Sequence, residues 1–213
     1  MSERPSYRKR LLAEYGQLAP QYEKRWSEYL KNSHQLARSL LPENLPGPKD
    51  NWLDVACGTG MWLAQLRDLL DGPLIGLDLN ADMLRHAMAK NIANAKFLRA
   101  GAESLPLEDE SVSGISCLNA LHYFNNAEHT LDEFVRVLKP KSHLLIVDWC
   151  ADYWFQAHVL PWVLRLSRHA HARTWRSAEL QRALEARGLK VGLNTKLRFS
   201  PVWELMGVTA QKL

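Results

Sequence analysis

The segment NWLDVACGTGMWLAQL, residues 51–66, constrains the fold of this chain more than any other stretch of its sequence. It passes from an apolar, β-prone run through small residues and glycines directly into an amphipathic run with helical spacing. Gly58 and Gly60 let the backbone approach a ligand without a Cβ in the way, and the next helix offers its N-terminus to a negative group. The segment therefore predicts a strand, a glycine turn that faces a nucleotide-like cofactor, and a helix.

Strand-like and helix-like segments continue to alternate along the chain up to Asp148. Strands are expected over Trp52–Val55, Leu74–Leu79, Lys96–Arg99, Val112–Leu118 and Leu144–Asp148, and helices over Met61–Leu70, Ala81–Asn91 and Ala127–Leu138. This alternation predicts an α/β fold with a doubly wound, mostly parallel sheet and crossover helices. Two more strands are expected near Leu189–Phe199 and Glu204–Gln211, paired antiparallel at the sheet edge.

Helical segments are expected on both sides of this core. From Tyr7 to Leu41 apolar residues recur every three or four positions, which predicts helices broken near Pro20. The proline-rich segment LPENLPGPKD, residues 41–50, ends them. After the core, an apolar helix kinked at Pro161 is expected over Trp154–His169.

A further helix is expected over Ala178–Arg187, closed by Gly188. With 213 residues, the chain is long enough for one good core and short for two. We therefore expect a single domain. Residues 1–45 would form a helical lid, residues 50–149 the cofactor-binding core, and residues 150–213 an acceptor-side helix with edge strands.

The composition excludes several classes of protein. No run of about eighteen apolar residues exists, which argues against a membrane span. The N-terminus has no apolar segment of the kind that signal peptides carry, and the three cysteines are odd in number and far apart, so a reducing, cytoplasmic location is expected. An acidic centre, with 9 basic and 15 acidic side chains over residues 42–150, separates two basic flanks. Those flanks indicate either an anionic ligand or ordinary solvated helix faces.

Two positions narrow the choice of cofactor. Asp78 ends the second expected strand about twenty residues after the glycine turn, where a carboxylate can accept hydrogen bonds from both ribose hydroxyls. The dinucleotide fingerprint needs a third glycine, and Leu63 occupies that position. A cofactor with a ribose and no pyrophosphate is therefore favoured over NAD(P).

Four segments, LDVACGTG, GLDLNADML, AESLPLEDESVSGISCLNALHYF and VLKPKSHLLIVDW, resemble the successive motifs of class I S-adenosylmethionine-dependent methyltransferases. The resemblance covers about residues 52–149, in the order and spacing of that family. It implies a Rossmann-like methyltransferase fold with a seven-stranded sheet and S-adenosylmethionine as the cofactor. The opening EYGQLAPQYEKRW also resembles the N-terminal lid of small bacterial members.

The resemblance assigns cofactor contacts residue by residue. It places Asp54, Ala56, Gly58 and Gly60 at the methionine end, Asp78 on the ribose, Leu79 and Met83 on the adenine faces, Ala102 and Glu103 at the adenine edge, the carbonyl of Asn119 near the sulfonium, and Tyr22 in the lid. One departure concerns Gly101, where many relatives have an aspartate that accepts from the adenine amino group.

Methyl transfer is an in-line displacement, so the protein mainly aligns the acceptor and excludes water. His122 and Tyr123 are the catalytic candidates, and His122 comes first because its ordinary pKa is near neutrality. The alternative is that His122 only packs or orients its loop. Candidates for binding a small aromatic or acidic acceptor at O, N or C are Tyr15, Trp26, Tyr153, Trp154, His158 and Arg173; a helix core or a dimer face would explain the same aromatic residues.

Other hypotheses about the function remain open from the sequence. An NAD(P)-dependent oxidoreductase is one alternative, and a non-catalytic cofactor-binding regulatory protein is another. A nucleic-acid methyltransferase is disfavoured because NALHYF stands where such enzymes carry an Asn/Asp-Pro-Pro-Tyr/Phe motif. No metal site is expected, since His169 and His171 are two residues apart and point away from each other on a helix. The chain would act as a monomer or a homodimer, with no membrane span.

Overall fold

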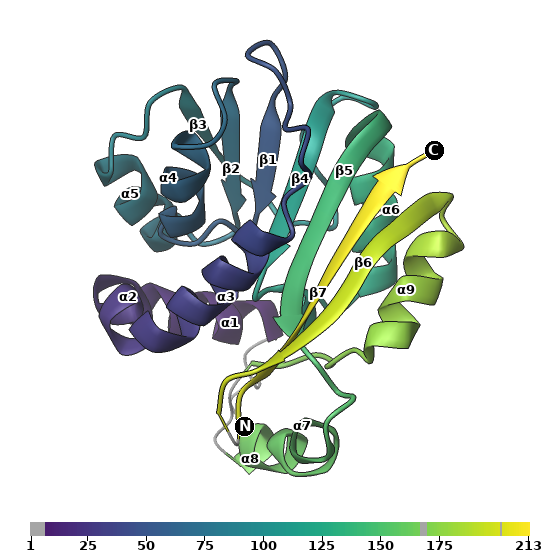
Figure 1. Cartoon of the computed structure of the whole chain (residues 1–213). Helices are drawn as coiled ribbons and strands as arrows, with labels where there is room; N and C mark the ends of the chain where they lie inside the picture. The colour runs from purple at the N-terminus through teal and green to yellow at the C-terminus, as the bar shows by residue number, and fades with distance from the viewer. Residues whose placement is uncertain (1–6, 167–169, 201) are drawn as a thin grey trace.

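A single mixed sheet of seven strands organises the chain, whose computed structural model describes residues 7–166, 170–200 and 202–213 (Figure 1). The strands are β1 (Trp52–Val55), β2 (Leu74–Asp78), β3 (Ala95–Arg99), β4 (Val112–Leu118), β5 (Leu138–Trp149), β6 (Leu189–Arg198) and β7 (Glu204–Lys212). Their order is β3-β2-β1-β4-β5-β7-β6. β1 to β5 are parallel, and β7 runs antiparallel to both β5 and β6. The predicted doubly wound, mostly parallel sheet is confirmed, with the reversed strand β7 one place in from the edge.

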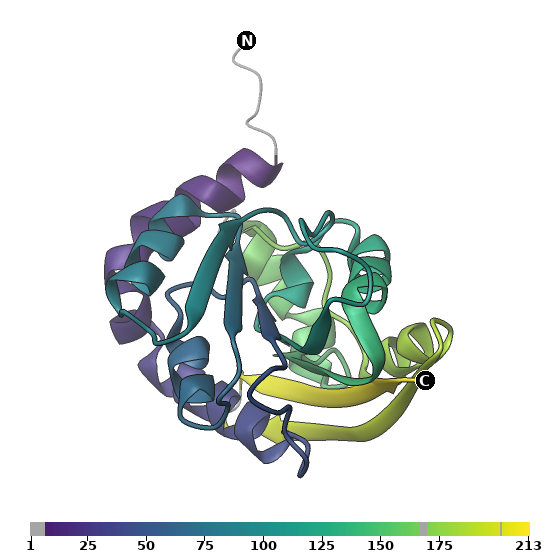
Figure 2. The same ribbon diagram turned by 90° about the horizontal axis from the view of Figure 1, so that it is seen from above.

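Helices cover the sheet on both faces. They are α1 (Tyr7–Leu18), α2 (Tyr22–Arg25), α3 (Ser27–Ser39), α4 (Met61–Arg67), α5 (Ala81–Ala89), α6 (Ala127–Val137), α7 (Trp154–His158), α8 (Leu160–Leu166) and α9 (Ser177–Glu185). Apolar residues of α3, α4 and α5 form one core cluster with the sheet, and those of α6 and α9 form the other. Figure 2, seen from above, shows α1 beside α5, outside this sandwich. No helix in the described part of the chain has the length and apolar character needed to cross a membrane.

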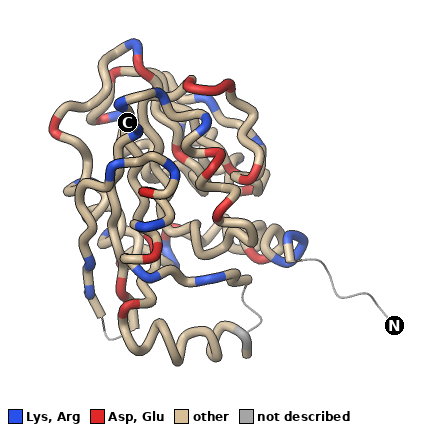
Figure 3. Tube along the Cα trace, turned by 90° about the vertical axis from the view of Figure 1, so that its right-hand side faces the viewer, with Lys and Arg blue, Asp and Glu red and all other residues tan. Residues whose placement is uncertain are grey.

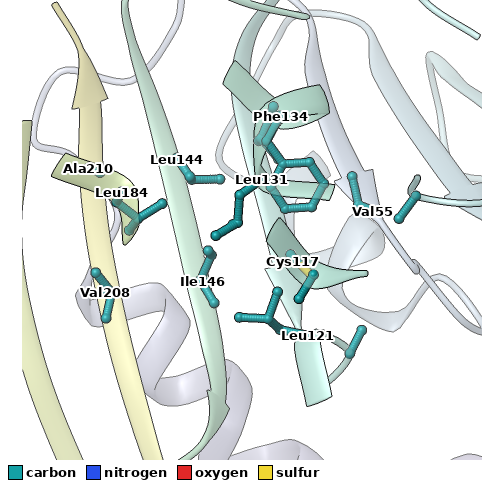
Figure 4. Packing of buried hydrophobic residues seen from close by; sticks show 14 of the residues in the cluster. Val55, Cys117, Leu121, Leu131, Phe134, Leu144, Ile146, Leu184, Val208 and Ala210 are labelled. Carbon is teal, nitrogen blue, oxygen red and sulfur yellow. The ribbon is translucent and has the colours of Figure 1, made fainter. Parts of the chain in front are cut away.

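The cluster on the α6 side shows how the sequence builds the core. Leu131 and Phe134 lie one turn apart on α6 and are fully buried against β4 and β5 (Figure 4). Cys117 and Ile146 pair across those two strands and face the same cluster. β4 is buried along its whole length, and the hydroxyls of its two serines, Ser113 and Ser116, are satisfied by hydrogen bonds to carboxylates. This tight packing fixes the strand ends that carry the site.

The N-terminal helices follow the sequence prediction with one addition. α1 ends at Leu18, and Pro20 lies in a 3-10 turn over Ala19–Gln21, as the expected break requires. A second break at Trp26 separates α2 from α3 and was not predicted. The proline-rich segment 41–50 contains no helix or strand.

Two elements differ from their predicted bounds by more than three residues. β5 begins at Leu138, six residues before the expected start, because Leu138 pairs with Val112 and the pairing resumes at His143 after an irregular stretch. The expected helix over Trp154–His169 is divided at Val159 into α7 and α8. Pro161 has no N–H to continue the first helix, so the predicted kink is a complete break. Residues 167–169, at the predicted end of this helix, lie outside the described part of the chain.

Candidate cofactor and active site

A cavity of about 310 Å³ lies at the carboxyl ends of β1, β2 and β4. Its floor comes from the turns that follow these strands, including Gly58, Asp78 and Asn119. Tyr7, Leu11 and Tyr15, spaced four residues apart on one face of α1, line the same cavity. β1 and β4 are sequence-distant neighbours at the point where the strand order reverses, and ligands of open α/β sheets bind there.

The glycine turn has an unusual backbone conformation. Ala56, Gly58 and Gly60 have φ values of +57°, +54° and +76°, in the left-handed region. A Cβ added at Gly58 would meet no described atom within 4 Å, so the backbone is open toward the cavity. At Gly60 a Cβ would lie 3.0 Å from the Ala87 side chain of α5, and Gly60 does not line the cavity. Gly58 therefore serves ligand approach, while Gly60 serves helix packing.

Asp78 is one of the residues that line this cavity. Its Oδ2 accepts a hydrogen bond of 2.9 Å from the Gly58 amide, and its Oδ1 accepts one of 2.8 Å from the Asn80 amide. Burial raises the pKa of Asp78, and these backbone donors act in the opposite direction. The carboxylate thus joins the glycine turn to the loop after β2 and fixes both beside the cavity.

The residues predicted to contact adenine all line this cavity. Leu79 and Met83 come from the end of β2 and from α5, and Ala102 and Glu103 from the segment after β3. Asn80 begins α5: its Oδ1 accepts from the amides of Asp82 and Met83. The structure therefore brings together the residues that the resemblance assigned to adenine, while their binding role stays a prediction.

A second cavity, of about 40 Å³, shares lining residues with the first. Tyr22, Ala56, Gly58, Leu118 and Asn119 line both cavities. Asp54 lines the smaller one, and its Oδ1 accepts a hydrogen bond of 2.6 Å from the Ser116 hydroxyl. Burial raises the pKa of Asp54 to about 7. The residues predicted for the adenine end line the larger cavity and Asp54, predicted for the methionine end, lines the smaller one, while their binding roles stay predictions.

Asn119 ends β4 in a left-handed conformation, with φ +57°. Its Oδ1 accepts hydrogen bonds from the Tyr29 hydroxyl at 2.8 Å and from the Ser33 hydroxyl at 3.0 Å. Both donors lie on α3, so this side chain ties the N-terminal helices to the sheet. The proposed role of its carbonyl beside a sulfonium stays a prediction.

The two catalytic candidates lie in different surroundings. Tyr123 lines the larger cavity, and its hydroxyl lies 2.5 Å from that of Tyr15. His122 is buried and lines neither cavity. Its Nδ1 lies 2.5 Å from Asp148 Oδ1, and its ring stacks on the Trp149 ring, with 3.9 Å between the two ring centroids. This arrangement favours the alternative in which His122 orients the loop that carries Tyr123.

Among the predicted acceptor residues, Tyr15 lines the cavity and five others do not; these are Trp26, Tyr153, Trp154, His158 and Arg173. Trp26 packs edge-on against Trp203, and Arg173 lies 4.2 Å over the Trp175 ring. Trp154 on α7 is 70% exposed. Figure 3 shows α7 and α8 as a segment without charged residues over 154–164, at the bottom of the view. The turn after β5 carries this helix pair away from the cavity.

Sequence reasoning missed residues that line the cavities from outside the recognised motifs: Tyr7, Arg8, Leu11, Leu12, His34, Trp62 and Asn125. The i, i+4, i+8 spacing of Tyr7, Leu11 and Tyr15 was the available signal, since it places them on one helix face. No group of three His, Cys, Asp or Glu side chains that could hold a metal ion occurs in the described ranges.

Comparisons with known proteins agree with this geometry. A family model described as a methyltransferase domain matches residues 23–192. A phthiotriol/phenolphthiotriol dimycocerosates methyltransferase of Mycobacterium ulcerans is 37% identical over 98 residues, 45% of this chain and 36% of that protein. A demethylmenaquinone methyltransferase of Lactiplantibacillus plantarum is 31% identical over 135 residues, 56% of this chain and 57% of that protein. The matches thus span only part of the length of these curated relatives.

Solved structures show the same fold. A chain from the Haloferax volcanii complex between a methyltransferase activator and a methyltransferase is 22% identical, with a TM-score of 0.79, and the match covers 93% of this chain and 97% of that chain. The family model extends over most of the chain, including the cavity-lining turns after β1, β2 and β4. The resemblance to this family is therefore confirmed. The chain belongs to the class I S-adenosylmethionine-dependent methyltransferases, a family whose cofactor is S-adenosylmethionine.

Proposed function

We propose that this chain catalyses methyl transfer from S-adenosylmethionine to O, N or C of a small aromatic or acidic molecule. The observation that carries this proposal is the pair of neighbouring cavities at the strand ends, with Asp78 lining the larger one and Asp54 lining the smaller one. A carboxylate beside the larger space suits two ribose hydroxyls, and one in the smaller space suits an ammonium group. The open backbone at Gly58 leaves room for the sulfur and the groups next to it.

The chain's own residues would hold the reactants and exclude water. When bound, S-adenosylmethionine supplies a methyl group on a positively charged sulfur. Tyr15, Tyr22 and Tyr123 line the larger cavity, Tyr22 also lines the smaller one, and their rings would shield a bound ligand from solvent. Burial raises the pKa of Tyr15 and of Tyr123, so their hydroxyls stay neutral and act as hydrogen-bond donors. Alignment and desolvation are therefore the main contributions that we assign to this site.

The acceptor class is inferred from the wall of the cavity. Tyr7, Tyr15, Tyr123 and Phe124 form an aromatic surface, which favours a planar acceptor. Arg8 lines the same cavity and can pair with an acidic group. The relative from Lactiplantibacillus plantarum is named for demethylmenaquinone, a quinone, which supports a planar acceptor for this chain. The three cysteines are all free and buried, which supports a reducing compartment such as the cytoplasm.

Isothermal titration tests the cofactor first. S-adenosylmethionine and S-adenosylhomocysteine should bind the wild type, while NADH and NADPH should not. Asp78→Ala should abolish or strongly weaken binding of the first pair. Asp71→Ala is a matched control because Asp71 is exposed and lies before the amino end of β2, whereas Asp78 lies at its carboxyl end.

A screen of aromatic and acidic small molecules with methyl-labelled cofactor then tests the reaction. Transfer of label to an acceptor supports the enzyme. Binding of S-adenosylmethionine without transfer across a broad screen would favour a cofactor-binding regulatory protein. Binding of NAD(P) alone would overturn the proposal in favour of an oxidoreductase.

A further inference from the structure

The smaller cavity contains a buried donor that the residues around it leave unused. Trp62 on α4 is 3% exposed and lines this cavity. Its indole Nε1–H has no hydrogen-bond partner among the described residues. A buried N–H without a partner is energetically unfavourable, so such a group in a cavity wall points to a ligand that accepts a hydrogen bond from it.

His34 on α3 lines the same cavity next to Trp62, with 5.6 Å between the two ring centroids. Its Nδ1 lies 2.8 Å from the side-chain nitrogen of Gln65. An amide nitrogen is a donor, so Nδ1 accepts this bond and Nε2 carries the ring proton. Burial lowers the pKa of His34 to about 4, which keeps the ring neutral near pH 7. His34 therefore adds a second neutral N–H donor to this wall.

Asp54 gives the cavity a group of the opposite kind. It comes from β1, is 2% exposed, and is the carboxylate among the cavity-lining residues. The remaining lining includes apolar side chains such as Leu30, Met61 and Leu118. A space of this size with one carboxylate and two N–H donors matches a small zwitterion that has one ammonium and one carboxylate group.

We propose that Trp62 and His34 bind the α-carboxylate of the amino-acid part of the cofactor, while Asp54 faces its ammonium group. This assignment rests on the proposed function, because it requires that a ligand of the S-adenosylmethionine type occupies both cavities. It makes the Trp62–His34 pair the part of the site that distinguishes the complete cofactor from its fragments. The larger cavity would hold the adenosine part equally well, whether the ligand is the complete cofactor or a fragment without the amino-acid part.

Titration with two ligands separates this role from a general effect on binding. S-adenosylhomocysteine carries the amino-acid group, whereas 5′-methylthioadenosine has the same adenosine and thioether without it. Trp62→Phe keeps a large ring and removes the N–H. It should weaken S-adenosylhomocysteine binding about tenfold, the effect of one hydrogen bond to a charged group, and change 5′-methylthioadenosine binding by less than about twofold. His34→Phe should show the same selectivity.

Trp175→Phe is the matched control. Its Nε1–H is also buried without a partner in the described chain, but Trp175 lines neither cavity, so both affinities should stay unchanged. If Trp62→Phe weakens both ligands equally, or neither, the assignment of the carboxylate is overturned while the proposed function stands. If the wild type binds neither ligand, the proposed function itself fails. Retained 5′-methylthioadenosine binding also shows that each variant is folded.

Discussion

The hydroxyl of Tyr15 on α1 lies 2.5 Å from the hydroxyl of Tyr123, 108 residues further along the chain. The Tyr7 hydroxyl donates a second hydrogen bond, of 2.9 Å, to the Tyr123 carbonyl. On the opposite side of the cavity, the Asn80 side chain donates to the Leu12 carbonyl at 2.9 Å. α1 is thus fastened to the loops after β2 and β4 and forms one wall of the larger cavity. We propose that α1 is a lid that must detach before a bound cofactor leaves.

Loss of the tyrosine pair should loosen this lid. Tyr15→Phe removes the hydroxyl but keeps the ring, and we expect S-adenosylhomocysteine to dissociate faster by about three- to tenfold, the effect of one hydrogen bond. Stopped-flow fluorescence measures this rate. Tyr153→Phe is the control, because Tyr153 does not line the cavity. Limited proteolysis near α1 should also slow when ligand is bound, and identical cleavage with and without ligand would contradict a moving lid.

Cofactor affinity should depend on pH through Asp54. Burial raises the pKa of this carboxyl to about 7, so in the ligand-free protein it is protonated at lower pH. An ammonium group requires the carboxylate, so affinity for S-adenosylhomocysteine should rise with pH, by up to about tenfold per unit, and level off above about pH 7. Titrations between pH 5.5 and 8.5 measure this dependence. The profile for 5′-methylthioadenosine should be flat over the same range.

The same carboxyl should reduce the stability of the ligand-free protein at high pH. An acid whose pKa is higher in the folded than in the unfolded state favours folding at low pH, and this contribution is lost as pH rises through the folded value, about 7 here. Asp54→Asn stays neutral at every pH. We therefore expect its melting temperature to exceed that of the wild type at pH 8 and to differ less at pH 5. If the ligand-free wild type melted at a higher temperature than Asp54→Asn at pH 8, the prediction would be contradicted, and the folded protein would stabilise the carboxylate well.

Much of the fold could be predicted because its central strands carry local signals. β1 and β4 are buried along their length and end at clear turns. The start of β5 gave no such signal: Lys139 and Lys141 are polar, and the pairing there is interrupted. The break at Trp26 between α2 and α3 involves neither proline nor glycine, so it depends on packing that sequence periodicity does not report.

In the candidate site, too, some residues could be predicted from the sequence and others could not. Asp78 and Met83 were predicted because they belong to segments whose place in the sheet is set locally. His34 and Trp62 were missed because their approach to the glycine turn depends on how α3 and α4 pack on the sheet. Trp154 was predicted to bind the acceptor because of its aromatic character, but the position of α7 leaves it exposed to solvent. Residue type alone could not distinguish these cases.

Asn80 allows helix capping to be separated from lid attachment. Its Oδ1 accepts from the first amides of α5, and its Nδ2 donates to the Leu12 carbonyl of α1. Asn80→Ala removes both interactions, whereas Asn80→Ser keeps a capping oxygen but is too short to reach α1. We expect Asn80→Ala to lower the free energy of unfolding by about 1–2 kcal/mol and Asn80→Ser by less than about 0.5 kcal/mol.

Both variants should nevertheless release S-adenosylhomocysteine faster than the wild type, because both lose the bond to Leu12. Urea unfolding measures the first effect and stopped-flow dissociation the second. If release were faster in Asn80→Ala but not in Asn80→Ser, it would follow the loss of the helix cap. The bond to Leu12 would then not matter for release, and α1 would be held by its other contacts. Faster release in both, with stability lost in one, would establish that the start of α5 is an attachment point of the lid.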